Sequence, residues 1–293
     1  MRIHVLQVGY GDEEPFGARV DRVSALVAQQ TGADLVVLPE LWAAGGFAYR
    51  GWADTAEAVP GGPVVSAISA AARAAGCAVH AGSVIERDAS GHLWNTSVLL
   101  DATGAVTATY RKMHRFGFGE GEPRLLAAGT DLVIAEVPTS ARVPDPHPGP
   151  RPGPRPGPGP GPDHSHDPLT VGLATCYDLR FPELFRALLD AGATAFVVPA
   201  AWPAARVEHW TLLGRARAVE NQCVLIAANT AGTHSRHTMG GRSQVVGPMG
   251  EVLGEAGDEE EILVVDLDPA GIAAARAAFP VLADRRLRPT LQG

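Results

Sequence analysis

The chain has 293 residues, a formal net charge of −8 and a pI of about 5.7. This acidity argues against nucleic acid as a partner, because binding phosphates requires a dense basic face. Hydrophobic residues make up 46% of the chain, so it can bury a large core without disulfide or metal cross-links.

The three cysteines include no CxxC pair, which argues against zinc or redox motifs and favours a reducing cytoplasm. The N-terminus lacks the basic start and long apolar stretch of a signal peptide. No apolar run approaches the ~18 residues that a membrane span requires. We therefore predict a cytoplasmic protein with no membrane partner.

The first half of the chain predicts strands that alternate with helices. Runs rich in β-branched residues indicate strands, and apolar residues three or four positions apart indicate helices. The expected elements are strands at 3–8, 34–38, 78–85, 94–100, 105–110 and 132–137, with helices at 18–30 and 63–75. The Asp101–Gly104 turn predicts a hairpin between the strands at 94–100 and 105–110.

A proline- and glycine-rich segment at about 144–168 interrupts this pattern. Proline fixes φ and lacks a backbone donor, so the segment is predicted to be a disordered, extended loop of polyproline II character. We interpret it as an insertion within a single domain that spans residues 1–293, because the strand after it is needed to complete the sheet. Binding of a partner by this loop is the alternative.

The second half resumes the alternation of strands and helices. The expected elements are strands at 169–175, 195–198, 224–228 and 262–267, a hairpin at 244–253, and helices at 182–191, 205–221 and 269–278. Asp268 is the expected N-cap of the last helix. Alternating elements together with hairpins predict an α/β protein with mixed sheets and helices on the outside.

Three polar residues follow strand-like runs: Glu40 after DLVVLP, Lys112 after the strand that ends in TYR, and Cys176 after VGLAT. Strand ends are where α/β folds usually place reactive groups. Each residue alone has a simpler explanation, a solvated charge or an inert buried thiol. Cys77 and Cys223 lack comparable flanking motifs and are expected to be core thiols.

The flanking sequences change this reading. LPELW at 38–42, YRKMH at 110–114 and CYDLRFPELFR at 176–186 resemble, in this order, the three catalytic motifs of the nitrilase (carbon–nitrogen hydrolase) superfamily. The resemblance continues through 197–222 and 244–255 and covers essentially the whole chain apart from the insertion. It implies a four-layer α-β-β-α sandwich of the nitrilase type that forms a homodimer or larger homo-oligomer. No cofactor and no metal are implied, since no phosphate loop, dinucleotide fingerprint or metal cluster is found.

The resemblance implies Cys176 as nucleophile with Glu40 and Lys112 as its partners, and the residue types suit this chemistry. A free thiol with a pKa near ~8.5 is mostly protonated at neutral pH. Glu40 can take this proton as general base. Lys112 and the backbone N–H of Tyr177 would then stabilise the oxyanion. Ammonia would leave with a proton from Glu40, and water would hydrolyse the thioester.

A second glutamate follows the lysine in the family pattern E-x-x-x-L-x-x-G. Glu122 in EPRLLAAG matches this spacing, and by resemblance it would position Lys112 or the substrate. The preceding HRFGFGEGEP is shorter and richer in glycine than the family pattern. The alternative for Glu122 is an ordinary loop carboxylate.

Further candidates for substrate binding are Arg180, Trp202 and His209. Arg180 could bind a substrate carboxylate, although we favour a structural role in which it pairs with Asp178 and shapes the turn after the nucleophile. Trp202 and His209, in the segment AWPAARVEHW, fall near the pocket in the matching branch of the superfamily. Packing is the simpler explanation for both.

CYDLRFPEL, together with AWPxxRxxHW and ARAxENQ, is most similar to the branch that holds ω-amidases and deaminated-glutathione amidases. The implied partner is a small amide that carries a carboxylate, hydrolysed to the acid and ammonia. An N-carbamoyl amidohydrolase of the ureidopropionase kind is the enzymatic alternative. A non-catalytic scaffold that uses the proline-rich loop is the non-enzymatic one, and the presence of Glu40, Lys112 and Cys176 together argues against it.

Overall fold

The computed structural model describes residues 1–139 and 168–287. The proline-rich insertion predicted at about 144–168 lies outside these residues except for Pro168. Its predicted disorder and its partner-binding alternative therefore stay predictions, as does the single-domain organisation.

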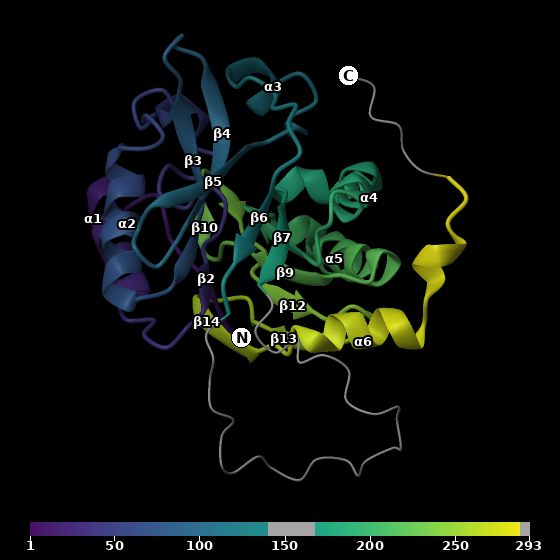
Figure 1. Ribbon diagram of the computed structural model, residues 1–293. Helices are drawn as coiled ribbons and strands as arrows, with labels where there is room; N and C mark the ends of the chain where they lie inside the picture. Colours follow the sequence, from purple (N-terminus) through teal and green to yellow (C-terminus); the bar gives the residue numbers. More distant parts are fainter. Residues whose placement is uncertain (140–167, 288–293) are drawn as a thin grey trace.

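Two six-stranded sheets lie at the centre of the molecule (Figure 1). The first contains β1 (Arg2–Gln7), β2 (Leu35–Val37), β3 (Ala78–Arg87), β4 (Leu93–Leu100), β5 (Val106–Arg111) and β14 (Glu261–Asp266) in the order β14-β1-β2-β3-β4-β5. The second contains β6 (Ile134–Val137), β7 (Leu169–Leu173), β8 (Ala195–Pro199), β9 (Val224–Ala228), β12 (Gln244–Val246) and β13 (Val252–Glu255) in the order β13-β12-β9-β8-β7-β6. Each sheet has three parallel central strands flanked by antiparallel ones.

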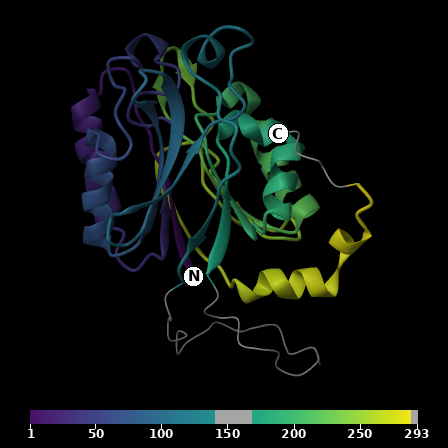
Figure 2. The same ribbon diagram turned by 45° about the horizontal axis from the view of Figure 1, so that its top comes forward.

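Helices cover the outer faces of both sheets (Figures 1 and 2). The first sheet carries α1 (Phe16–Ala28) and α2 (Pro63–Ala75), and the second carries α4 (Pro182–Asp190) and α5 (Val207–Asn221). One apolar cluster fills each helix–sheet interface, and a third lies between the sheets. The predicted four-layer α-β-β-α sandwich is therefore confirmed.

The remaining elements are short: α3 (Glu122–Leu125), α6 (Ala270–Ala278), the two-stranded hairpin of β10 (Thr233–His234) and β11 (His237–Thr238), and the 3-10 helices η1 (Tyr49–Gly51), η2 (Cys176–Arg180), η3 (Ala204–Arg206) and η4 (Val281–Asp284). Within the described ranges, no helix is long and apolar enough to cross a membrane.

Sequence signals explain where several elements begin and end. Helix α2 has Pro63 at its first position and ends at Gly76, whose φ of +68° is accessible to glycine without strain. The helix predicted at 205–221 is divided instead, because Arg206 (φ −134°, ψ 23°) separates η3 from α5. Asp268 accepts the N–H of Ala270 at 3.1 Å, although Pro269 is the residue that caps α6.

The central strands read as continuous apolar runs because both of their faces are covered. Every residue of β2, β8 and β9 is buried. Polar contacts join the two sheets near the end of β7: Ser97 Oγ lies 2.8 Å from Thr175 Oγ1, and the Tyr110 hydroxyl donates to Asp178 at 2.8 Å. These contacts fix the end of β7 against β4 and β5, where the polar candidates gather.

Candidate active site

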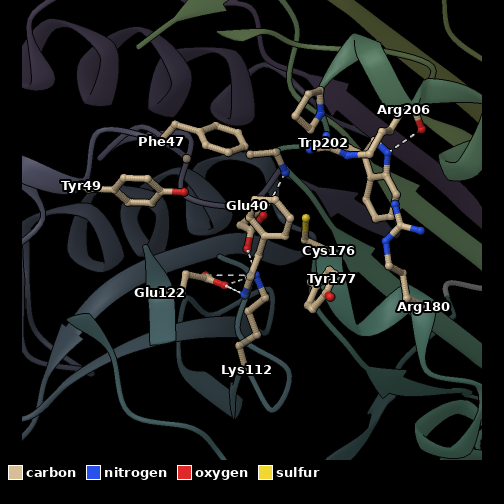
Figure 3. A pocket seen from close by; sticks show the side chains of 14 residues that line it. Glu40, Phe47, Tyr49, Lys112, Glu122, Cys176, Tyr177, Arg180, Trp202 and Arg206 are labelled. Carbon is tan, nitrogen blue, oxygen red and sulfur yellow. Dashed lines mark hydrogen bonds and ion pairs between the residues drawn. The ribbon is translucent and has the colours of Figure 1, made fainter. Parts of the chain in front are cut away.

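Glu40, Lys112 and Cys176 line one pocket (Figure 3). Glu40 and Lys112 follow strands of the first sheet, β2 and β5, whereas Cys176 follows β7 of the second and opens η2. The pocket therefore lies where strands of the two sheets end side by side. Glu40 and Lys112, 72 positions apart in the chain, meet at the end of the first sheet. Cys176, 64 positions after Lys112, joins them because the two sheets pack face to face.

Lys112 lies between two buried carboxylates. Its Nζ is 2.7 Å from Glu40 Oε1 and 3.0 and 2.8 Å from the two oxygens of Glu122. The three side chains are at most 5% exposed. Backbone N–H groups also donate to the carboxylates, Ala201 to Glu40 at 2.9 Å and Phe116 to Glu122 at 2.6 Å. The two carboxylates are thus fixed in place by backbone donors from two separate segments of the chain.

Burial and charge together set the protonation of this cluster. Burial disfavours the charged form of Lys112, but Glu122 and Glu40 outweigh it and raise the pKa of Lys112 well above its ordinary value. Burial raises the pKa of Glu122, against the opposing effect of Lys112. Burial, and then the negative charge of Glu122, raises the pKa of Tyr49 to about 12. Lys112 is therefore an ammonium and Tyr49 a neutral phenol at neutral pH.

The Cys176 thiol is protonated in the resting protein. Burial raises its pKa well above the ordinary value, and the negative charge of Glu40 raises it further, while Lys112 opposes both effects. Nucleophilic attack by this sulfur therefore requires a base that removes its proton. Glu40 lines the same pocket and is close enough for its charge to act on the thiol.

The backbone at Cys176 adopts a left-handed conformation, with φ of +47°. This region is unfavourable for residues with a β-carbon and requires support from the surroundings. A capping box supplies it: the side chain of Thr175 accepts from the backbone of Asp178, and Asp178 accepts the N–H of Thr175 at 2.8 Å. The turn thereby presents the sulfur to the pocket.

Asp178 is fully buried, and its partners differ from the predicted one. Its carboxylate accepts from Tyr110, from Thr175 and from the backbone and ring of His114 at 2.7–2.9 Å. The predicted pairing with Arg180 is wrong, because these donors occupy the carboxylate inside the protein. Arg180 extends instead toward the mouth of the pocket (Figure 3).

The mouth of the pocket is aromatic and basic. Phe47, Tyr49, Phe116 and Tyr177 line it, with ring centroids 5.3 Å apart for Phe116 and Tyr177. The backbone N–H of Tyr177 lies in the first turn of η2, where helical N–H groups lack partners within the helix. Its role as oxyanion donor stays a prediction.

Two guanidinium groups lie over aromatic rings at this mouth. The guanidinium carbon of Arg180 is 4.8 Å from the ring centre of Trp202, and that of Arg206 is 5.5 Å from Phe116. Trp202 lines the pocket, and its ring N–H donates to the backbone of Arg206 at 2.7 Å. His209 does not line this pocket: it is exposed on α5, with its Nδ1 3.3 Å from Arg180.

Sequence reasoning missed several residues of the site. Asn95 joins the charged cluster from β4, and Phe47, Tyr49, Phe116 and Arg206 form part of the wall. A signal for Asn95 exists in the sequence, because NTS at 95–97 places three consecutive polar residues, all buried, within an otherwise apolar strand. The wall residues lie in loops or in single-turn 3-10 helices and carry no periodic signal.

The described residues contain no group of three or more histidine, cysteine, aspartate or glutamate side chains arranged to hold a metal ion. The pocket itself brings together a thiol, carboxylates and an ammonium.

This α/β fold holds a thiol, a carboxylate and an ammonium in one pocket, and comparison with known proteins identifies the family. The sequence pattern described as carbon–nitrogen hydrolase matches residues 2–277. The chain therefore belongs to the carbon–nitrogen hydrolase family, within the nitrilase superfamily, and it is a hydrolase that acts on carbon–nitrogen bonds.

Two similar proteins are both 2-oxoglutaramate amidases. The one from Paenarthrobacter nicotinovorans is 39% identical over 287 residues, which covers 97% of this chain and 89% of the relative. The one from Bacillus subtilis is 32% identical, and the match covers 87% of this chain and 85% of the relative. Among solved structures, XC1258 of Xanthomonas campestris, a CN-hydrolase superfamily protein, is 28% identical and superimposes with a TM-score of 0.82. The match covers 100% of this chain and 99% of XC1258.

Proposed function

We propose that this enzyme hydrolyses the amide group of a small carboxylate-bearing molecule to the acid and ammonia, through a thioester on Cys176. The names of similar proteins support this substrate class, since they include 2-oxoglutaramate amidase and deaminated glutathione amidase. The geometry of the pocket supports the chemistry and offers a place for the carboxylate.

In the first half-reaction, Glu40 takes the thiol proton while the sulfur attacks the amide carbon. The resulting oxyanion is stabilised by the Lys112 ammonium and the backbone N–H of Tyr177. Glu40 then returns the proton to the amide nitrogen, the carbon–nitrogen bond breaks, and ammonia leaves a thioester on Cys176.

In the second half-reaction, a water molecule replaces ammonia. Glu40 takes a proton from this water as its oxygen attacks the thioester carbon. The carbon–sulfur bond breaks, the acid leaves, and the sulfur recovers its proton. Glu122 positions Lys112 throughout, because both of its oxygens accept from Nζ at 3.0 and 2.8 Å.

One observation carries the substrate class: two guanidinium groups at the mouth have no carboxylate partner within residues 1–139 and 168–287. Arg180 contacts His209 and Trp202, and Arg206 lies over Phe116. A planar guanidinium is well suited to bind a carboxylate through two parallel hydrogen bonds. An amide that enters toward Cys176 would leave its carboxylate beside Arg180 and Arg206.

The test is an ammonia-release screen with matched substrates. We expect 2-oxoglutaramate and deaminated glutathione to be hydrolysed with much higher kcat/KM than uncharged amides of the same length. Turnover confined to N-carbamoyl amino acids would favour the ureidopropionase-like alternative, and equal turnover of charged and uncharged amides would contradict the assigned role of the mouth. An acyl adduct on Cys176, detected by intact mass after acid quench, tests the thioester.

A matched pair of arginine variants separates the mouth from general charge effects. Arg206→Met should raise KM for the carboxylate-bearing amide by about tenfold or more, since a hydrogen bond to a charged group contributes roughly 1.5–3 kcal/mol. It should leave an uncharged amide unaffected. Arg215→Met, on the exposed face of α5, removes the same charge away from the pocket and should change neither.

A further inference from the structure

Asn95, in β4, is hydrogen-bonded to both carboxylates of the charged cluster. Its Nδ2 donates to Glu40 Oε1 and to Glu122 Oε1, each at 2.8 Å, and the residue is only 2% exposed. One side-chain amide thus connects the two acids that also share Lys112. No other side chain within the described residues connects them in this way apart from that of Lys112.

The charge of the cluster explains the need for such a group. Two ionised carboxylates and one ammonium leave a net charge of −1 in a buried site, and like charges this close favour the protonation of one acid. A second cation would neutralise the site but would also compete for the oxyanion that Lys112 stabilises. An amide supplies two donors without adding charge.

The orientation of the amide is determined by its neighbours. The reverse orientation would place Oδ1 against two carboxylate oxygens, which is repulsive, so Nδ2 must face the acids. In this orientation Oδ1 is buried and has no donor among the described residues. A buried polar atom without a partner is unfavourable, and an apolar side chain would avoid it. The presence of an asparagine here, despite its unpaired oxygen, indicates that the two hydrogen bonds donated by Nδ2 are important for the site.

We propose that Asn95 is a positioning residue that holds the carboxylate of Glu40 in place for proton transfer from Cys176. The inference rests on the role of Glu40 as base in the proposed function. Asn95 does not contact the reacting atoms in this arrangement; it acts through Glu40 and Glu122.

The backbone of Asn95 allows the amide to be tested by itself. Its carbonyl accepts the N–H of Lys112 at 2.8 Å, a bond that any side chain at this position preserves. Asn95→Leu, similar in size, removes both side-chain donors while β4 and the position of the Lys112 backbone are kept. Asn95→Asp has the same shape but replaces the donors by a third negative charge.

Both variants take away the two donors that favour the charged form of the acid cluster, and Asn95→Asp also adds a repulsive negative charge beside it. The acid limb of the kcat/KM profile should move upward by about one pH unit in Asn95→Leu and further in Asn95→Asp. Thr96→Val is the matched control: Thr96 is the next residue of β4, is buried, and donates to Glu86 at 2.6 Å and not to the acids of the site.

A second measurement does not depend on any amide substrate. The rate at which iodoacetamide labels Cys176 reports on removal of the thiol proton, with Cys176→Ala as the blank for Cys77 and Cys223. The pH of half-maximal labelling should move upward in the same order, while Thr96→Val should match the wild type. If labelling shifts but no screened amide is hydrolysed, the proposed substrate class fails and the role of Asn95 stands.

The opposite result would overturn the inference. If Asn95→Leu and Asn95→Asp lower activity only in proportion to their loss of thermal stability, with both pH profiles superimposed on that of the wild type, Asn95 has a structural role alone. If Asn95→Asp does not fold, the uncharged leucine variant gives the same decision.

Discussion

The floor and the mouth of the pocket are built in different ways. The floor consists of Glu40, Asn95, Lys112, Glu122 and Cys176, which are all at least nine-tenths buried. Its members lie on strands or next to their ends, or in short helices, and its charges are paired at 2.7–3.0 Å.

The mouth consists of Phe47, Phe116, Tyr177, Arg180 and Arg206, which are only partly buried. Most of these side chains lie in loops or at the ends of 3-10 helices, and they contact one another through ring faces and edges. Its guanidinium groups lack carboxylate partners within the described ranges. From this contrast we expect the floor to carry out the reaction and the mouth to select the substrate.

The largest effect should come from the nucleophile. Cys176→Ala should lower kcat by at least ~10³-fold, measured by ammonia release, because the attacking atom is removed. Cys77→Ala is the control, since this thiol is buried between α2 and β3 and burial raises its pKa to about 11. It should leave kcat within about twofold. If Cys176→Ala retained measurable turnover, Cys176 would not be the nucleophile and the proposed role of the floor would be wrong.

The next largest effect should come from the buried ammonium. Lys112→Met leaves two buried carboxylates without their cation, and breaking a buried ion pair in this way costs about 3–5 kcal/mol of unfolding free energy. Activity should also fall by two to three orders of magnitude, roughly as on loss of an oxyanion donor.

The neighbouring Arg111 provides the control for this variant. Its pair with Glu86 is on the surface side of β5, with Arg111 39% exposed. Arg111→Met should cost about 1 kcal/mol and leave kcat unchanged, as measured by urea unfolding and steady-state kinetics. If Lys112→Met and Arg111→Met lost equal unfolding free energy, the buried ion pairs of the floor would be no more important for stability than the surface pair.

The stability of the protein should decrease in acid because of His234, which supports the segment beside Phe47 at the mouth. His234 stacks on Tyr10, whose hydroxyl accepts the N–H of Gly46 beside Phe47. Burial, and then the charge of Arg19, lowers the pKa of His234 to about 4 from 6.5. Between these two values the unfolded chain binds the proton and the folded protein does not, so stability falls as pH decreases from about 6.5 toward 4.

The size of this effect can be measured by difference. At pH 5 the single histidine should account for about 2 kcal/mol of lost unfolding free energy relative to neutral pH. His234→Gln should lose that part of the pH dependence in urea unfolding experiments. If the stability of the variant falls with pH as steeply as that of the wild type, His234 does not titrate as its burial implies.

The smallest effect should come from His209, which is exposed on α5 outside the pocket. His209→Ala should change kcat/KM by less than about twofold and stability by no more than ~0.5 kcal/mol. A large rise in KM for carboxylate-bearing amides would instead place His209 in the mouth, acting through its contact with Arg180 at 3.3 Å.

Local sequence determined the elements and the reactive residue types. Apolar runs and helical spacing predict most strands and helices to within a few residues, because burial on one or both faces imposes those patterns. The motifs around Glu40, Lys112 and Cys176 mark the residues that line the floor. The division of the helix at Arg206 and the two-residue strands β10 and β11 were missed, because such short features leave no periodic signal.

Only the tertiary structure decided which side chains meet. Two partners of Asp178, Tyr110 and His114, come from β5 and the loop after it, and Asn95 reaches Glu40 across 55 positions of the chain. Arg180 and Arg206 become neighbours of one pocket because η2 and η3 follow adjacent strands of one sheet. Such pairings depend on how the two sheets pack and on where the loops turn. Hydrophobic periodicity records which face of an element is buried, and it does not record which residue lies opposite.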